Sequence, residues 1–274
     1  MSGPTARARP ACVVTGSTGI GAATAERLAA AGWSVFVVSR RADHARALAG
    51  RLAGGGASTA WHAADLTVES EADGAIAAAA ATFGRIDGLL SVAGGSGRRF
   101  GDGPIHELTA EGWDRTIELN LRSQALVCRA VVRRMLGQGP RPPGTRGSIV
   151  LVGSVLAARP VPELFATHAY AAAKGAITAL ATTMAAFYAR DLIRVNVVAP
   201  SLTATPMAER AARDARTVSF ARRKQPLVGG FVAADDVAAA AAYLLSDDAR
   251  AVTGQVLTVD GGWSVVAVEP DAAP

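Results

Sequence analysis

The stretch Ala11-Cys-Val-Val-Thr-Gly-Ser-Thr-Gly-Ile-Gly21 decides the fold expected of this chain. It begins as a short apolar run, which predicts a buried strand, and continues through a glycine-rich turn into a helical segment. Glycines at such a junction let backbone amides approach a pyrophosphate at the positive end of the helix, although a lone glycine cluster can also be an ordinary tight turn. The candidate nucleotide-binding residues of this turn are Gly16, Ser17, Thr18, Gly19, Ile20 and Gly21.

Short apolar runs of the same kind recur along the chain and alternate with alanine-rich segments of helical composition. The expected strands are Ala11–Val14, Val35–Val38, Thr59–Ala63, Leu89–Val92, Ser148–Val152, Arg194–Val198 and Gln255–Val259. The expected helices are Ala22–Ala31, Glu69–Thr82, Trp113–Leu136, Tyr170–Ala189 and Ala234–Leu245. Strands buried on both faces and joined by helices predict a parallel sheet with right-handed crossovers. We therefore predict an α/β protein with a doubly wound, mainly parallel seven-stranded sheet, the Rossmann fold.

The chain has 274 residues, a length that α/β folds routinely hold around one sheet. The proline- and glycine-rich loop from Gly137 to Gly147 does not divide it into separate cores. We therefore expect a single domain over residues 11–264, a flexible N-terminus over 1–10 and a C-terminal tail over 265–274.

The formal charge of +5 and the pI near 9.8 raise the question of an anionic partner. The arginine pairs are dispersed, and no basic tract of five or more occurs, so a solvated surface is favoured over a nucleic-acid footprint. No segment is long and apolar enough for export or membrane spanning, and two cysteines are too few for a disulfide framework. We expect a cytoplasmic protein with no nucleic-acid partner, no membrane contact and no metal.

The second expected strand ends in Ser39-Arg40-Arg41. An NAD-preferring Rossmann protein places an acid here to hold the ribose hydroxyls. Ser39 is small and neutral, and guanidinium groups match the geometry of a 2′-phosphate. NADP(H) is therefore the expected cofactor and NAD(H) the less favoured one, with solvent-facing arginines as the plain alternative.

The sharpest chemical signal is Tyr170-Ala-Ala-Ala-Lys174, because positions i and i+4 of a helix lie on one face. A phenol is a poor acid and base near pH 7, and a neighbouring cation is expected to lower its pKa. The pair therefore predicts a tuned general acid/base, although the same spacing also occurs in exposed pairs with no function. Of the 28 basic residues only Lys174 and Lys224 are lysines, so a lysine at this position is informative.

The order of these features resembles the short-chain dehydrogenase/reductase family from about Ala11 to Trp263. Besides the glycine turn and the Tyr-Lys pair, the chain has Ser154 at a strand end and Asn120 in the phrase ELNLRS. The resemblance implies that Ser154 hydrogen-bonds the substrate carbonyl, that Tyr170 transfers a proton and that Lys174 holds the nicotinamide ribose. It also implies that Asn120 supports a water relay to the lysine. A strand-end cap and a core amide are the structural alternatives for Ser154 and Asn120.

The resemblance also extends the cofactor site. It implies an adenine-binding Asp in HAADLT, a cofactor-lining Ala-Gly after the fourth strand, and a segment after the sixth strand that grips the nicotinamide carboxamide. These residues are Asp65, Leu66, Ala93, Gly94, Pro200, Thr203 and Thr205. The chain departs from the family where its glycine turn is one residue short and where Ser91 and Val92 replace two asparagines.

The function expected from this resemblance is hydride transfer between NADP(H) and a small-molecule carbonyl or secondary alcohol, by a homodimer or homotetramer. The substrate loops would be Ser96–Gly103, Val155–Ala169 and Leu202–Pro226, whose apolar side chains suggest a moderately hydrophobic ketone pocket. A non-catalytic dinucleotide-binding sensor or scaffold is the alternative that the shortened turn leaves open. A basic nucleic-acid binder is the second alternative.

Overall fold

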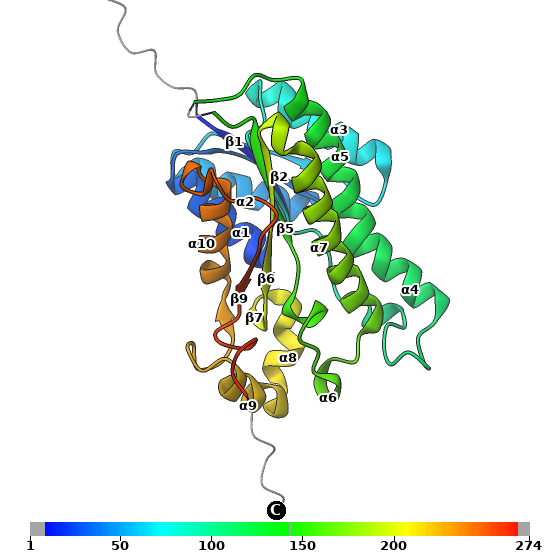
Figure 1. The fold of residues 1–274 in the computed structure, drawn as a ribbon. Coiled ribbons are helices and arrows are strands. Elements are labelled where there is room, and N and C mark those ends of the chain that lie inside the picture. The colour runs from blue at the N-terminus through cyan, green and yellow to red at the C-terminus, as the bar shows by residue number, and fades with distance from the viewer. Residues whose placement is uncertain (1–8, 143, 268–274) are drawn as a thin grey trace, which may run out of the picture.

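The computed structural model describes residues 9–142 and 144–267 and is built on a seven-stranded parallel sheet (Figure 1). The strands lie in the order β3-β2-β1-β4-β5-β6-β9, and every neighbouring pair is parallel. The predicted fold class, a single doubly wound Rossmann domain, is confirmed. The strands are β1 (Ala11–Thr15), β2 (Ser34–Ser39), β3 (Thr59–Ala63), β4 (Gly88–Ser91), β5 (Gly147–Val152), β6 (Ile193–Pro200) and β9 (Val256–Val259).

Helices cover both faces of the sheet (Figure 1). Successive side chains of a strand point to opposite faces, so Val13 of β1 joins one core cluster while Cys12 and Val14 join the other. The first cluster contains residues of α3 (Glu69–Phe83), α5 (Ser123–Leu136) and α7 (His168–Tyr188). The second contains residues of α1 (Gly19–Ala30), α2 (Ala42–Gly54) and α10 (Ala234–Leu245).

Several expected boundaries were wrong. The first helix begins at Gly19 instead of Ala22, because the glycine turn itself enters the helix, and α2 was not predicted. The expected helix Trp113–Leu136 is α4 (Ala110–Ile117), a π-helical segment (Glu118–Arg122) and then α5. The edge strands β3 and β9 are not buried on both faces, since each has only one neighbouring strand.

The expected substrate loops hold short elements that the sequence did not indicate. The segment Leu202–Pro226 contains β7 (Thr203–Ala204), α8 (Glu209–Arg213) and α9 (Ala215–Lys224), and β7 pairs with β8 (Val232–Ala233). The loop Val155–Ala169 contains α6 (Pro162–Phe165). Most of the expected N-terminal and C-terminal tails, residues 1–8 and 268–274, lie outside the described residues.

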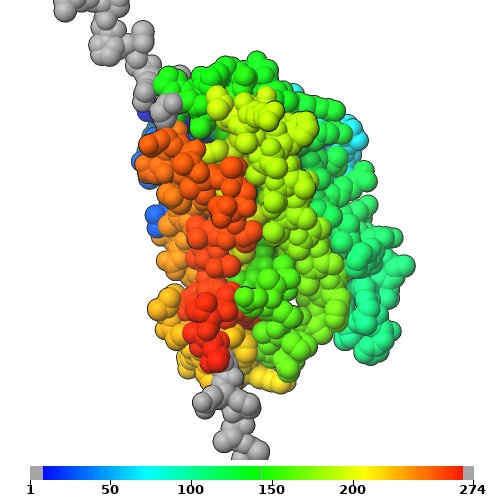
Figure 2. Space-filling model, in the orientation of Figure 1, coloured from blue at the N-terminus to red at the C-terminus, as the bar shows by residue number. Residues whose placement is uncertain are grey.

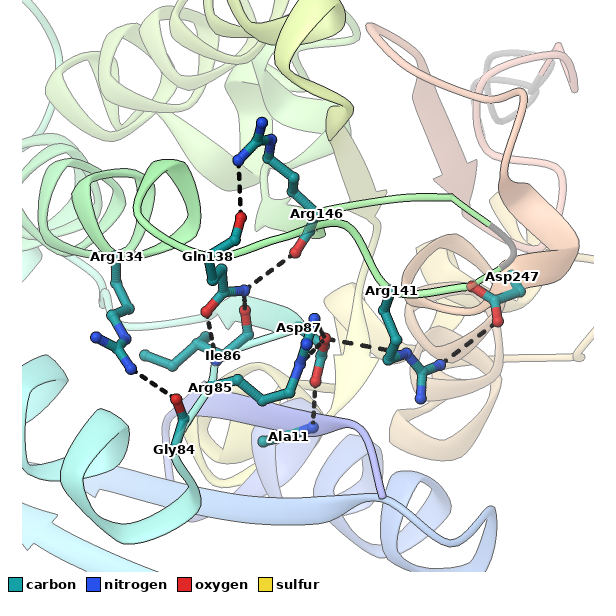
Figure 3. Close-up of polar contacts among 10 residues, drawn as sticks. All are labelled: Ala11, Gly84, Arg85, Ile86, Asp87, Arg134, Gln138, Arg141, Arg146 and Asp247. Atoms are coloured by element: carbon teal, nitrogen blue, oxygen red, sulfur yellow. Dashed lines mark hydrogen bonds and ion pairs between the residues drawn. The ribbon is translucent and has the colours of Figure 1, made fainter. Parts of the chain in front are cut away.

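The amino ends of the central strands are held by a network of buried and half-buried polar groups (Figure 3). The carboxylate of Asp87 accepts the backbone N–H of Ala11 at 3.0 Å and pairs with Arg85 at 2.6 Å. Gln138 donates to the carbonyls of Ile86 and Arg146 at 2.6 and 3.2 Å. These bonds join the start of β4 to β1 and to the segment that leads into β5, so this edge of the sheet is closed by internal bonds.

One side of the molecule is formed by C-terminal segments. Figure 2 shows β9 and the residues after it, in orange to red, on the surface beside α7 in yellow-green. Val256 and Leu257 of β9 are 42% and 37% exposed, as expected for an edge strand. Within the part of the chain that the structure describes, no helix is long and apolar enough to cross a membrane.

Candidate active site

The glycine turn lies at the carboxyl end of β1, where β1 separates β2 from β4 and the order of the strands reverses. Glycine is required at three positions of this turn, because an added Cβ atom would come too close to neighbouring atoms. A Cβ on Gly16 would lie 2.8 Å from Val92 Cγ1, one on Gly21 would lie 2.6 Å from the Gly16 carbonyl oxygen, and one on Gly19 would lie 3.0 Å from Thr205 Cγ2. Gly16 and Gly19 also have φ values of +154° and +53°, which side chains rarely adopt.

Thr15 fixes this turn against the next strand of the sheet. Its hydroxyl accepts the backbone N–H groups of Val92 and Ala93 at 3.0 and 3.2 Å. Val92, which stands where the family has an asparagine, packs against Gly16. The position of the family's asparagine is therefore taken by an apolar side chain, Val92, which contacts the shortened turn at Gly16.

The adenosine end of the expected cofactor site contains Ser17, Ser39, Arg40 and Arg41. Ser17 donates to Ser39 at 3.0 Å, and Ser39 accepts the backbone N–H of Arg41 at 3.3 Å. The guanidinium of Arg41 is paired with Asp43 at 2.6 Å, and this bond lowers the pKa of Asp43 to about 2. Asp43 is an acid that the sequence reasoning missed, although it stands two residues after Arg41.

Asp65 lies near this end of the sheet, directly after β3. Its Oδ1 accepts the backbone N–H of Thr67 at 3.0 Å and the hydroxyl of Thr67 at 2.7 Å. Burial raises the pKa of Asp65, but the two bonds from Thr67 and the positive charge of Arg40 outweigh it, so the pKa lies below its usual value. Asp65 shapes the turn before α3, and Leu66 beside it is buried.

Ser154, Tyr170 and Lys174 meet at the carboxyl end of β5. Ser154 follows the strand and accepts the N–H of Leu156 at 3.2 Å, and its hydroxyl is close enough to Tyr170 to lower the pKa of the phenol. Lys174 is only 3% exposed, and its Nζ donates to the Val152 carbonyl at 2.8 Å. The same Nζ lies 5.5 Å from the centroid of the Tyr170 ring.

Burial dominates the ionisation of this pair. It raises the pKa of Tyr170 because the phenolate loses hydration, and the neighbouring hydroxyl of Ser154 offsets this only in part. It lowers the pKa of Lys174 from 10.5 to about 8. The expectation that Lys174 lowers the pKa of Tyr170 is wrong for this arrangement, because the ammonium is directed to the carbonyl of Val152 instead of the phenol.

Asn120 lies within the π-helical segment and is completely buried. Its Nδ2 donates to the carbonyls of Gly95 and Thr116, both at 2.9 Å, and its Oδ1 accepts the N–H of Gly95 at 3.0 Å. A Cβ on Gly94 would lie 2.6 Å from Asn120 Oδ1 and 3.7 Å from Lys174 Nζ. Asn120 and Lys174 therefore lie on either side of Gly94 without bonding each other directly.

The helix that carries Tyr170 and Lys174 is capped by a residue that the sequence reasoning missed. Thr167 precedes α7 but makes no capping bond with its side chain. Asp102, 5% exposed, supplies the cap from the loop after β4, since its carboxylate accepts the N–H groups of Ala169 and Tyr170 at 3.0 and 3.1 Å. Nothing local in the sequence connects these positions.

The segment after β6 closes the site from the other side. Pro200 ends β6, Thr203 lies in β7 with its hydroxyl 3.1 Å from the Ser201 carbonyl, and Thr205 contacts Gly19 of the glycine turn. The buried amide of Gln225 bonds the backbone N–H and carbonyl of Leu202 at 3.1 and 3.2 Å. All of the predicted site residues therefore lie along the carboxyl edge of the sheet, between β3 and β6.

Comparison with known proteins gives consistent matches over almost the whole chain. Residues 14–264 match a family model described as enoyl-(acyl carrier protein) reductase. A cis-4-hydroxycyclohexanecarboxylate dehydrogenase of Sinomonas cyclohexanicum is 37% identical over 255 residues, which cover 93% of this chain and 96% of that protein.

Two solved structures extend this likeness to the fold. A short-chain type dehydrogenase/reductase from Mycobacterium ulcerans aligns with a TM-score of 0.85 at 32% identity and covers 94% of this chain and 91% of its own. A 3-ketoacyl-(acyl-carrier-protein) reductase from Brucella melitensis complexed with NADH aligns with a TM-score of 0.80 at 29% identity, over 93% and 98% of the two chains.

Replacing the cap of α7 should destabilise the fold. Asp102→Ala leaves two buried N–H groups without an acceptor, so the free energy of unfolding should fall by about 1–3 kcal/mol, while Asp102→Asn, which keeps one acceptor oxygen, should lose less. Urea denaturation measures both. The control is Asp73→Ala, which removes a half-exposed pair with Arg129 and should cost less than about 1 kcal/mol. Equal small losses for Asp102→Ala and Asp73→Ala would contradict the capping role.

Burial of Lys174 should appear in the pH dependence of stability. Its pKa is about 8 in the folded chain and 10.5 in the reference state, so between these values the unfolded chain binds more protons than the folded one. Wild-type stability relative to Lys174→Met should therefore rise with pH across this window, by up to about 3 kcal/mol. Urea unfolding of both proteins at pH 7 and pH 10 measures the difference. Parallel pH profiles would show that Lys174 does not titrate near 8.

Proposed function

The chain belongs to the short-chain dehydrogenase/reductase family, an oxidoreductase family, and from this premise we propose that it reduces a small-molecule ketone or aldehyde with NADPH. The reverse reaction would oxidise the corresponding secondary alcohol. One observation carries the proposal: the half-buried phenol of Tyr170, close to Ser154, lies one helical turn from the buried Lys174, at the strand ends where the glycine turn also lies.

The residues at the glycine turn fit a dinucleotide. The first turn of α1 has no acidic residue, and its N-cap Thr18 makes no side-chain capping bond, so helix N–H groups remain for a phosphate. Gly16 and Gly21 leave no side chain in the way. When bound, NADP(H) supplies the hydride, and the chain's own groups bind, orient and move the proton.

The proposed preference for NADP(H) rests on Ser39, Arg40 and Arg41. Ser39 is neutral and small, so it does not repel a 2′-phosphate. Arg41 is already oriented by Asp43, and a phosphate would replace that carboxylate as its partner. Arg40 lies close enough to Asp65 to lower its pKa, so it also points toward the adenosine end.

The proton is proposed to come from Tyr170. Its raised pKa keeps the phenol protonated at neutral pH, as a general acid for reduction requires. Ser154, which lies close to Tyr170, would donate to the substrate carbonyl oxygen and hold it beside the phenol. Lys174 would bond the nicotinamide ribose and approach Tyr170, and Asn120 would hold the helix geometry next to Gly94.

A protein that only binds the dinucleotide would not need this arrangement. Burying the ammonium of Lys174 lowers its pKa and reduces stability at neutral pH, which an apolar side chain would avoid. The dehydrogenase names of the relatives further support a reaction over a sensor or scaffold. We also propose a homodimer or homotetramer, since the large apolar side chains of Trp113 in α4 and Phe187 in α7 are 41% and 73% exposed.

Removing the hydroxyl of Tyr170 should abolish chemistry and spare cofactor binding. Tyr170→Phe keeps the ring but removes the proton donor, so turnover should fall at least about a hundredfold while NADPH affinity stays nearly unchanged. Absorbance at 340 nm and cofactor fluorescence measure the two quantities. Tyr188→Phe, at the end of the same helix, is the control and should keep wild-type turnover. A Tyr170→Phe protein as active as the wild type would disprove the mechanism.

A negative charge at position 39 should reverse the cofactor preference. Ser39→Asp adds repulsion against a 2′-phosphate and an acceptor for ribose hydroxyls, so it should favour NADH over NADPH by at least about tenfold relative to the wild type. Asp43→Asn removes the carboxylate that competes for Arg41 and should shift the preference the opposite way. Titration of each protein with NADPH and NADH measures the preference. A wild type that binds NADH more tightly than NADPH would refute the proposed preference for NADP(H).

A further inference from the structure

The net positive charge of the chain is concentrated in the three segments around the substrate side of the site. Residues Ser96–Gly103, Val155–Ala169 and Leu202–Pro226 contain nine Lys or Arg and four Asp or Glu, a net charge of +5. The whole chain also has a net charge of +5, so the remaining residues hold 19 groups of each sign and are neutral together. The basic pI is therefore a local property of these segments.

The structure brings the three segments together beyond the carboxyl end of the sheet, where Figure 1 shows α6, α8 and α9. The guanidinium of Arg98, in the first segment, donates to the Leu164 carbonyl of α6 at 2.9 Å. Phe165 of α6 and Phe220 of α9 both pack against Trp263, with ring centroids 6.3 and 5.2 Å apart. These contacts make the segments one continuous rim.

Arg98 belongs to the loop whose Asp102 caps the helix of Tyr170 and Lys174. Arg98 precedes Asp102 by four residues, and the carboxylate of Asp102 accepts the backbone N–H of Tyr170 in the first turn of α7. Leu164, whose carbonyl accepts the guanidinium of Arg98, precedes Tyr170 by six residues. Arg210 lies in the third segment of this rim. It belongs to α8, five residues after Thr205, which contacts the glycine turn.

Arg98 and Arg210 have no acidic partner within ion-pair distance among the described residues. Arg213 on the same helix α8, by contrast, is paired with Glu209. Partial burial and then repulsion from the positive charge of Arg210 lower the pKa of Arg98, while the negative charge of Asp102 raises it. An anion between them would remove this repulsion and satisfy N–H groups that no carboxylate now binds.

We propose that the substrate carries an oxyanion group, such as a carboxylate, away from its reacting carbonyl, and that Arg98 and Arg210 bind this group. The inference rests on the proposed function and adds the chemical class of the substrate. The 2′-phosphate of the cofactor does not account for these arginines, because the residues proposed to bind it lie at the end of β2, which β1 separates from β4, β5 and β6. Positive charge at the rim would also steer anionic substrates toward the site.

Matched pairs of ketones test the proposal. 4-Oxocyclohexanecarboxylate and 4-oxopentanoate are compared with their methyl esters in steady-state reduction with NADPH. The acids should have a kcat/KM at least about tenfold above the esters, and only the acids should lose efficiency as salt rises. Arg98→Met and Arg210→Met should raise KM for the acids at least about tenfold and leave the esters and NADPH within about twofold. Arg213→Met, whose cation is already paired, is the control and should resemble the wild type.

Other outcomes count against the proposal. Esters reduced as efficiently as acids, or a loss in Arg98→Met that is the same for both, would overturn it and leave the proposed reductase activity intact. A rise in KM for NADPH alone would assign the charge to the cofactor. If no ketone is reduced, the proposed function fails, and calorimetric titration of cyclohexanecarboxylate into the NADP⁺-saturated protein decides the anion site separately. Binding that Arg98→Met does not weaken would then exclude the site.

Discussion

The buried ammonium of Lys174 is the constraint on which the rest of the site depends. A charged group that is 3% exposed must be held by good hydrogen bonds, and the carbonyl of Val152 at 2.8 Å is the bond that the fold provides. That carbonyl is available because β5 ends at Val152 and its last peptide is free to turn toward α7. The end of one strand and the first turns of one helix must therefore be fixed relative to each other.

The fold meets this requirement with long-range bonds around α7. Asp102 accepts the backbone N–H groups of Ala169 and Tyr170, which follow it in the sequence by 67 and 68 positions. His168 at the start of α7 adds a bond between its Nδ1 and the Gly103 carbonyl at 2.9 Å. Gly97 allows this loop to pack, since a Cβ there would lie 1.8 Å from Thr116 Oγ1. The loop after β4 therefore orients α7, the helix that carries Tyr170 and Lys174.

The sequence predicted the sheet well because strand periodicity and glycine placement are local properties. It located all seven strands of the main sheet, and α10 was predicted with its observed bounds. It missed α8 and α9, whose short, strongly basic sequences have little apolar periodicity, and it placed Lys174 beside the phenol without the competing carbonyl of Val152. The roles of Asp102 and Gln225 depend on contacts between distant segments, which no spacing in the chain encodes.

The two edges of the sheet differ in how their charged side chains are paired. At the amino edge Asp87, Arg141 and Asp247 form ion pairs within the fold, and the carbonyls and amides of the loops are bonded to Gln138. At the carboxyl edge the buried hydroxyl of Ser201 lacks a hydrogen-bond partner, and Arg98 and Arg210 have no acidic partner among the described residues. Polar and charged groups without partners make the free protein less stable, and a ligand that binds them would restore the lost interactions. The fold can tolerate this at the carboxyl edge because the ion pairs of the amino edge stabilise it. In the proposed arrangement, the excess positive charge of this chain, whose pI is near 9.8, borders a site for small anions.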